Sequence, residues 1–260
     1  MVIIIVIKKD RGGACPPPLP FTLMVILPLI ILLTFLSTPL LAHQGAETRA
    51  LTDEAESYLP QAYRVVGTQA SGGLSGVVQV LGGRPVKEAL VYVKNVSQGK
   101  DFSTAGPLVL DQRDKLFVPH VLVVPVGSTV ELRNSDPEMH NLHAASVKNP
   151  AFNEGMPEGS TSLLKRFEQV EVVRLGCDLH QEMRAWIVVR DNPYYALTGK
   201  DGRFNITDIP PGTYKLSLWH EDLDKEKRNS LTTEVTVETD ATLEVDFYLA
   251  PKEQTANSRQ

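Results

Sequence analysis

A cysteine, a histidine and a methionine are the residues of this chain whose types and spacing are best suited to chemistry. Cys177, His180 and Met183 stand together in the sequence CDLHQEM, directly before an apolar run. Upstream, His140 and Asn141 stand in the sequence NSDPEMHNLH. A thiolate, imidazole rings and a thioether are metal-binding groups, and soft sulfur donors favour copper, zinc or iron–sulfur clusters. The pattern therefore predicts a metal centre.

The donor types favour copper over other metals. A trigonal plane of one cysteine sulfur and two histidine nitrogens, with a weakly held methionine sulfur on the axis, is the donor set of blue copper sites. The soft sulfur atoms suit Cu(I), whereas imidazole suits both oxidation states. A site held between these preferences needs little rearrangement when one electron arrives or leaves, so the donor set predicts electron transfer.

The cysteine content supports a ligand role for Cys177. The chain has only two cysteines, Cys15 and Cys177. If the N-terminal segment is removed as a leader, Cys177 is left alone and cannot form an internal disulfide. A single thiol in an oxidising compartment is an intermolecular bridge, a liability or a metal ligand.

Short strands between turns must position these donors. From residue 74 onward, runs rich in Val, Leu, Thr and Tyr alternate with Gly, Pro and Asn, and no helical period is sustained after residue 60. The alternating run Thr129–Arg133 leads into the segment with His140, and Ala185–Val189 follows Met183. The fold class is all-β, and two sandwiches fit the strands better than one.

The stretch from about residue 107 to residue 189 resembles a small type 1 copper protein of the plastocyanin family, with amicyanin as the nearest form. The turn Val126–Ser128, then His140-Asn141, then Cys177 with its two-residue spacings carry the resemblance. It implies a cupredoxin-like Greek-key β-sandwich over residues 100–192.

The resemblance also implies roles for individual residues. His140, Cys177 and His180 would be the equatorial ligands of one type 1 copper ion per chain, and Met183 would be the axial ligand. Asn141 would tie the two ligand loops together from the second shell. The implied function is one-electron transport with redox partner proteins, without turnover of a substrate.

The C-terminal part resembles a carboxypeptidase regulatory-like, or prealbumin-like, β-sandwich. Residues 198–216 supply an Asp-Gly turn, a strand, a Pro-Pro-Gly-Thr-Tyr turn and another strand, but the opening strands of that fold lie upstream of the copper segment. We therefore expect residues 74–99 and 193–250 to form one discontinuous immunoglobulin/prealbumin-like sandwich into which the copper domain is inserted. The alternative is two domains in tandem, with residues 74–99 as edge strands of the copper sandwich.

The N-terminus has the layout of a secretory signal. A basic cluster at residues 8–11 precedes an apolar run over residues 21–36 and a small-residue exit ending at Ala42. Residues 1–42 are thus expected to be a signal peptide cleaved near Ala42, which makes the protein periplasmic or otherwise exported from a bacterium. The alternative is a retained membrane tether, although a spanning helix needs about 20 apolar residues.

The remaining segments are polar, and the overall composition is that of a globular protein without a nucleic-acid-binding surface. Residues 43–73 are polar and small and are expected to be a linker, and residues 251–260 a polar tail. The chain is 42% hydrophobic and 22% charged, which is ordinary for a globular protein. Its net charge of −5 leaves no basic footprint for nucleic acid.

Several other interpretations remain open. His143 is expected to be structural, and zinc is the alternative metal, although its structural sites avoid Met and prefer more thiolates. Cys177 and His180 could act as nucleophile and base. Cleavage after Ala42 would expose His43, and an N-terminal histidine can hold copper in oxidative polysaccharide-cleaving enzymes. A non-catalytic carbohydrate- or protein-binding module, with a metal of structural or sensing role, is the remaining class.

Overall fold

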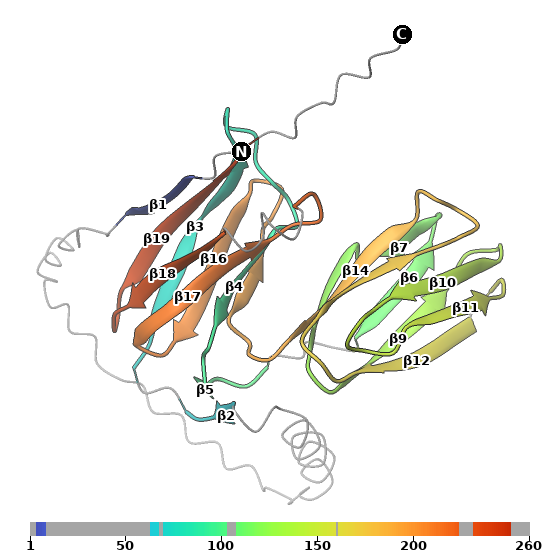
Figure 1. Ribbon diagram of the computed structural model, residues 1–260, viewed down its shortest axis with the longest axis horizontal. Coiled ribbons are helices and arrows are strands. Elements are labelled where there is room, and N and C mark those ends of the chain that lie inside the picture. The colour runs from blue at the N-terminus through green and yellow to red at the C-terminus, as the bar shows by residue number, and fades with distance from the viewer. Residues whose placement is uncertain are drawn as a thin grey trace, which may run out of the picture.

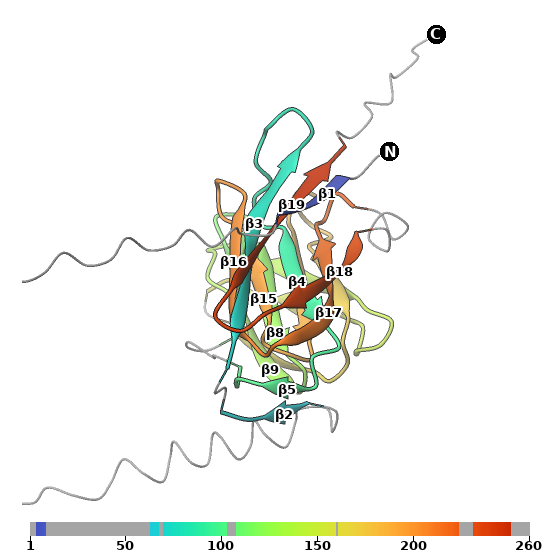
Figure 2. The same cartoon turned by 90° about the vertical axis from the view of Figure 1, so that its left-hand side faces the viewer.

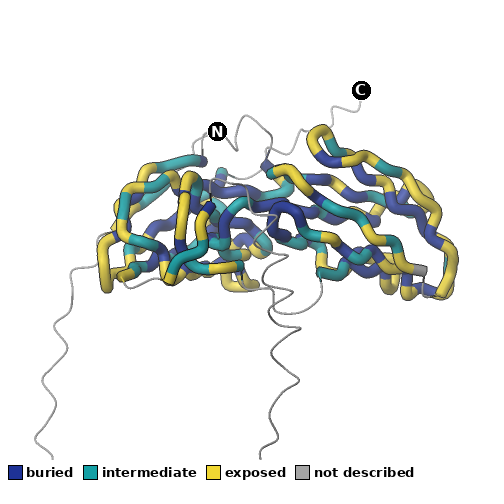
Figure 3. The backbone as a smooth tube through the Cα atoms, turned by 90° about the horizontal axis from the view of Figure 1, so that it is seen from below, coloured by how far each residue is buried: buried dark blue, intermediate teal, exposed yellow. Residues whose placement is uncertain are grey.

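The computed structural model describes residues 4–8, 63–67, 70–102, 108–159, 161–223 and 231–250. Within these ranges every regular element is a β-strand. The strands form two sandwiches that lie side by side (Figure 1), and buried residues run through the interior of each (Figure 3). The predicted all-β class is confirmed.

The sandwich formed by the middle of the chain, called here the metal sandwich, has a five-stranded and a four-stranded sheet. The first sheet contains, in spatial order, β11 (Phe152–Met156), β10 (His140–Ala145), β13 (Val172–Gly176), β14 (Arg184–Arg190) and β8 (Val121–Pro125). The second contains β12 (Thr161–Phe167), β9 (Ser128–Asn134), β6 (Val109–Arg113) and β7 (Leu116–Val118). β14 lies parallel to β8, and β6 lies parallel to β9. Some consecutive strands, such as β8 and β9 or β11 and β12, lie in different sheets, as in a Greek-key sandwich.

Side chains of β14 pack on both faces of its sheet. Ala185, Ile187 and Val189 are buried in the core of the metal sandwich. Trp186 and Val188 alternate with them and belong to a separate apolar cluster on the opposite face. Because side chains of a strand alternate between faces, one apolar run fills both clusters. The β14 sheet is therefore covered on both faces.

The second sandwich is built from both ends of the described chain. One sheet contains β1 (Ile4–Lys8), β19 (Thr242–Leu249), β3 (Gly72–Val80) and β16 (Arg203–Ile209). The other contains β15 (Tyr195–Leu197), β4 (Leu90–Lys94), β17 (Gly212–Trp219) and β18 (Thr232–Val237). β3 pairs with β16, and β4 pairs with β17. Strands from before and after the metal sandwich thus pair with each other, which is the pairing that the insertion hypothesis requires.

Hydrogen bonds hold together the two chain segments that connect the sandwiches. The backbone N–H of Lys100 donates to the Tyr194 hydroxyl at 2.9 Å, and the Asn192 side chain donates to the Val93 carbonyl at 3.1 Å. Gly99 has φ of +152°, and a Cβ at this position would collide with the Tyr194 hydroxyl. Residues on either side of the metal sandwich therefore lie within hydrogen-bonding distance of each other.

The two sandwiches also share a packed interface. Leu90 and Trp219 of the second sandwich belong to the same apolar cluster as the outward face of β14, and the Trp186 and Trp219 rings meet edge to face at 5.4 Å. Glu221 accepts hydrogen bonds from the Trp186 indole at 3.2 Å and from His120 at 3.0 Å. Apolar contact together with charged hydrogen bonds fixes one sandwich against the other.

Residues 4–8 of the predicted leader form a strand of the second sandwich. β1 pairs antiparallel with β19 at the edge of the second sandwich (Figure 2), and the Lys8 ammonium lies 2.8 Å from the buried Asp246 carboxylate. The apolar run over residues 21–36 and Ala42 lie outside the described residues. Among the described residues no helix is long and apolar enough to cross a membrane. Cleavage of residues 1–42 stays a prediction.

The predicted linker, residues 43–73, is also partly described. Arg64–Val65 forms β2, which pairs with β5 (Gln98–Gly99), and β3 begins at Gly72. Tyr63 is buried in the core of the second sandwich. The end of this segment is therefore folded onto the second sandwich, whereas residues 43–62 and the tail 251–260 lie outside the described residues.

The Glu171 carboxylate anchors the loop after β10. It accepts hydrogen bonds from the Ser146 hydroxyl at 2.7 Å and from the backbone N–H groups of Val147, Lys148 and Asn149 at 2.7 to 3.1 Å. Burial alone would raise its pKa, but these hydrogen bonds outweigh burial and lower the pKa to about 2. The loop is therefore held by an ionised carboxylate.

Replacing Glu171 by Gln should lower the free energy of unfolding at neutral pH by about 1.5 to 3 kcal/mol, the contribution of hydrogen bonds to a charged group. The pKa of Glu171 in the folded protein lies below its ordinary value. The ionised Glu171 carboxylate therefore contributes its full stabilisation above about pH 4.5, and this contribution is lost as the pH falls towards 2. Denaturant unfolding across this range should show the two proteins converging. Glu168→Gln, which changes an exposed carboxylate, is the control. A difference that persists at pH 2 would contradict this account.

Candidate metal centre

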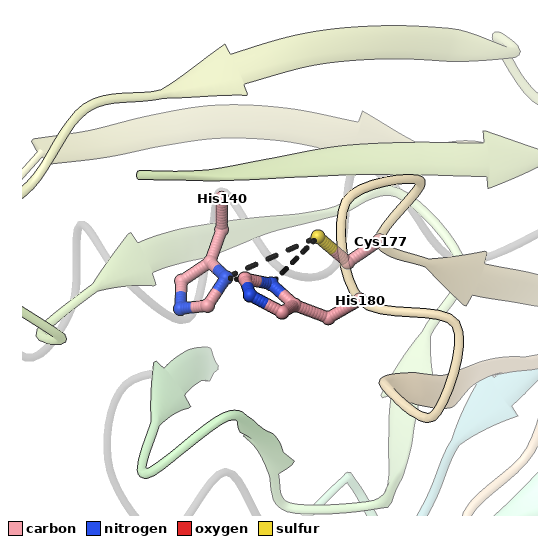
Figure 4. Close-up of side chains that lie close together, drawn as sticks. All are labelled: His140, Cys177 and His180. Atoms are coloured by element: carbon pink, nitrogen blue, oxygen red, sulfur yellow. Dashed lines mark hydrogen bonds between the residues drawn. The ribbon is translucent and has the colours of Figure 1, made fainter. Parts of the chain in front are cut away.

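Three donor atoms from two loops meet at one end of the metal sandwich. The Nδ1 atoms of His140 and His180 lie 3.0 Å apart, and the Cys177 Sγ lies 3.9 Å and 3.7 Å from them (Figure 4). The His140 side chain is fully buried, Cys177 is buried, and His180 is a quarter exposed. Among the described residues, these three form the one group of His, Cys, Asp or Glu donors close enough to share a metal ion.

The pairing of β10 with β13 brings these residues together. His143 of β10 lies opposite Gly176, the last residue of β13, so His140 and Cys177 project from the same end of the two strands. The loop that follows is closed by hydrogen bonds from Met183 N–H to the His180 carbonyl at 2.9 Å and from Cys177 N–H to the Met183 carbonyl at 3.2 Å. A short closed loop thus sets the spacing of the three downstream residues.

Asn141 connects the two ligand loops. Its side-chain oxygen accepts from Asp178 N–H at 2.6 Å, and its amide nitrogen donates to the Asp178 carboxylate at 3.0 Å. Its backbone N–H donates to the Cys177 sulfur at 3.5 Å. Hydrogen bonds therefore join the two loops, as expected from the sequence, and the Cys177 sulfur accepts one of them.

A buried carboxylate fixes the orientation of the His140 ring. Asp136 Oδ2 lies 2.7 Å from His140 Nε2, and it also accepts from Lys115 N–H, while Oδ1 accepts from Asp114 N–H. Burial alone would raise the pKa of Asp136, but these hydrogen bonds outweigh burial and hold the pKa below its ordinary value. An ionised Asp136 requires a donor at Nε2, and in a neutral imidazole this leaves the lone pair on Nδ1, the ring nitrogen that faces Cys177.

The residues present fit a metal ion. Nitrogen and sulfur atoms bound to one ion at about 2.0 to 2.3 Å are about 3 to 4 Å apart, and all three measured separations fall in this range. Lone pairs that converge on one point repel each other unless a proton or a cation lies between them. The arrangement of His140, Cys177 and His180 is therefore suited to a thiolate- and imidazole-bound cation.

The other predicted residues lie nearby. Met183 is buried in the same apolar cluster as Cys177, and both line an open cavity of about 430 Å³. His143 is half exposed and lies 3.0 Å from the Asp178 carboxylate, outside the donor group. Asp136 was not predicted, and its signal in the sequence is a carboxylate four residues before His140.

No family model and no curated protein matches this chain. Among solved structures it is similar to a purple cupredoxin from Nitrosopumilus maritimus, with 21% identity, 32% of this chain and 98% of that chain covered, and a TM-score of 0.28. It is also similar to an oxidised amicyanin mutant, with 24% identity, 34% of this chain and 86% of that chain covered, and a TM-score of 0.30. A reduced Cu(I) amicyanin mutant matches with 22% identity, 38% of this chain and 98% of that chain covered, and a TM-score of 0.30.

Proposed function

We propose that this chain is an exported type 1 (blue) copper protein that carries single electrons, with one copper ion per chain. His140, Cys177, His180 and Met183 would hold the ion, which would supply one-electron chemistry through its Cu(II) and Cu(I) states. The observation that carries the proposal is the convergence of two imidazole nitrogens and one sulfur within 3.9 Å.

The donor chemistry supports copper rather than zinc. Structural zinc sites usually have four tetrahedral ligands rich in thiolate, whereas blue copper sites combine one thiolate, two imidazoles and a weak thioether. Cys177 is the one cysteine within the described residues, and Met183 is buried beside it. This set includes ligands for both oxidation states of copper.

The protein supplies rigidity to the proposed electron transfer. Asp136 and Asn141 hold the upstream ligand loop, and Asn141 joins it to the downstream loop. Ligands that cannot move apart keep nearly the same arrangement when the charge of the ion changes. The hydrogen-bonded loops therefore support fast gain and loss of one electron.

Redox partner proteins would approach the exposed edge of His180. Leu179 and Met139, both more than half exposed, lie next to ligands in the two loops, and Glu138 adds a carboxylate 3.5 Å from His180. The proposed partners are proteins rather than nucleic acids, in the periplasm or another exported location. A membrane tether applies if the N-terminal segment is retained.

Replacing Cys177 by Ser should abolish the intense visible thiolate-to-copper absorption of the copper-loaded protein. The protein should stay folded by circular dichroism, because the core of the metal sandwich is formed by apolar residues of both sheets. Cys15→Ser, made in the full chain with residues 1–42 retained, is the matched control and should keep the absorption. A Cys177→Ser protein that retains a strong visible band would refute the site assignment.

Variants of His140 and His143, which lie three residues apart, test which histidine belongs to the metal site. His140→Gln should abolish or severely distort the copper absorption, because it removes a buried donor. His143→Gln should leave the absorption and the copper content unchanged, because His143 pairs with Asp178 at the surface. Copper content and visible spectra of both variants check this ranking, and the reverse ranking would show that the wrong histidine has been assigned.

A further inference from the structure

Each histidine of the proposed metal centre has a carboxylate next to its Nε2 atom, the ring nitrogen on the side away from Cys177. His140 Nε2 lies 2.7 Å from Asp136 Oδ2, and His180 Nε2 lies 3.5 Å from Glu138 Oε2. The two carboxylates come from one short segment directly before His140. The Nδ1 atoms of both rings face the sulfur, so each carboxylate acts on the metal centre through a ring.

One turn holds both carboxylates. Asp114 and Lys115, between β6 and β7, have φ of +54° and +57°, and their consecutive N–H groups donate to Asp136 at 2.6 Å and 3.0 Å. Two successive left-handed residues form the tight turns that suit two-residue hairpins. The Lys115 ammonium lies 2.9 Å from the Glu138 carboxylate. The same lysine thus holds Asp136 by its backbone and Glu138 by its side chain.

Resting on the copper function proposed above, we propose that Asp136 and Glu138 are positioning residues that lower the reduction potential of the copper ion, and that the Asp114–Lys115 turn holds them in place. Each carboxylate acts on a metal ligand and touches no metal.

The physical basis is the effect of a carboxylate on an imidazole. A carboxylate that accepts from the far N–H of a metal-bound imidazole fixes its tautomer and raises its basicity. The stronger donor and the added negative charge favour Cu(II) over Cu(I), which lowers the potential. The effect is expected to be larger for Asp136, whose carboxylate and partner ring are both buried, than for Glu138, which is 38% exposed and paired with Lys115.

The test uses the copper-loaded full chain and its variants Asp136→Asn and Glu138→Gln. Loss of such an outer partner weakens metal affinity by about 10- to 100-fold, and we expect Cu(II) to lose more than Cu(I). Each tenfold difference between the two oxidation states raises the potential by about 59 mV. Redox titration of the visible band and separate Cu(II) and Cu(I) competition assays measure both quantities.

Glu154→Gln is the matched control, since Glu154 is likewise an exposed carboxylate paired with a lysine, Lys165, at 3.1 Å. The expected result is a raised potential in both variants, larger for Asp136→Asn, with no change in the control. If Asp136→Asn does not fold by circular dichroism, Glu138→Gln decides alone, because its side chain lies at the surface.

An intact visible band with an unchanged or lowered potential in Glu138→Gln, or in a folded Asp136→Asn, would overturn this proposal and leave the copper function standing. A wild-type chain that binds copper without the visible band would overturn the copper function and this proposal with it.

Discussion

The antiparallel pairing of β10 with β13 is the constraint on which the metal centre depends. It places His140 and Cys177, which lie far apart in the sequence, at the same end of neighbouring strands. Asn141 then locks the two loops by hydrogen bonds to Asp178 and to the Cys177 sulfur. Strands and hydrogen bonds therefore hold the three donor atoms close together. Donors held in this way would suit the one-electron transfer proposed for the site.

The second sandwich contributes a fixed support. Its β3 and β4 strands precede the metal sandwich in sequence and pair with β16 and β17, which follow it. The metal sandwich therefore joins the rest of the molecule through two chain segments and through the cluster around Trp186 and Trp219. Glu221 reaches across this interface to His120, whose ring also lies 3.1 Å from the carbonyl of Arg184, the residue after Met183. His120 thus connects the end of the loop that carries Cys177, His180 and Met183 to the interface between the two sandwiches.

The sequence predicted the strands, the donor loop and the link through Asn141, and it missed the contact of Asp136 and the strand Ile4–Lys8. Alternating apolar residues predicted the strands, and the spacing of Cys177, His180 and Met183 predicted a donor loop that the structure closes. The role of Asp136 could not be predicted, because its orientation is set by a turn that lies about 20 residues upstream. The strand at Ile4–Lys8 was also missed, since its apolar residues and Lys8 were interpreted as part of a leader. Partners that lie far apart in the chain and belong to no recognised motif are not visible in one sequence.

Titration of the metal-free protein with Cu(II), followed by visible absorption, tests the central claim most directly. The arrangement of His140, Cys177 and His180 predicts an intense thiolate-to-copper band that grows in proportion to added copper and saturates at one ion per chain. Reduction by one electron should bleach the band, and reoxidation should restore it. Copper binding without such a band, or a band that does not saturate at one ion per chain, would contradict the account.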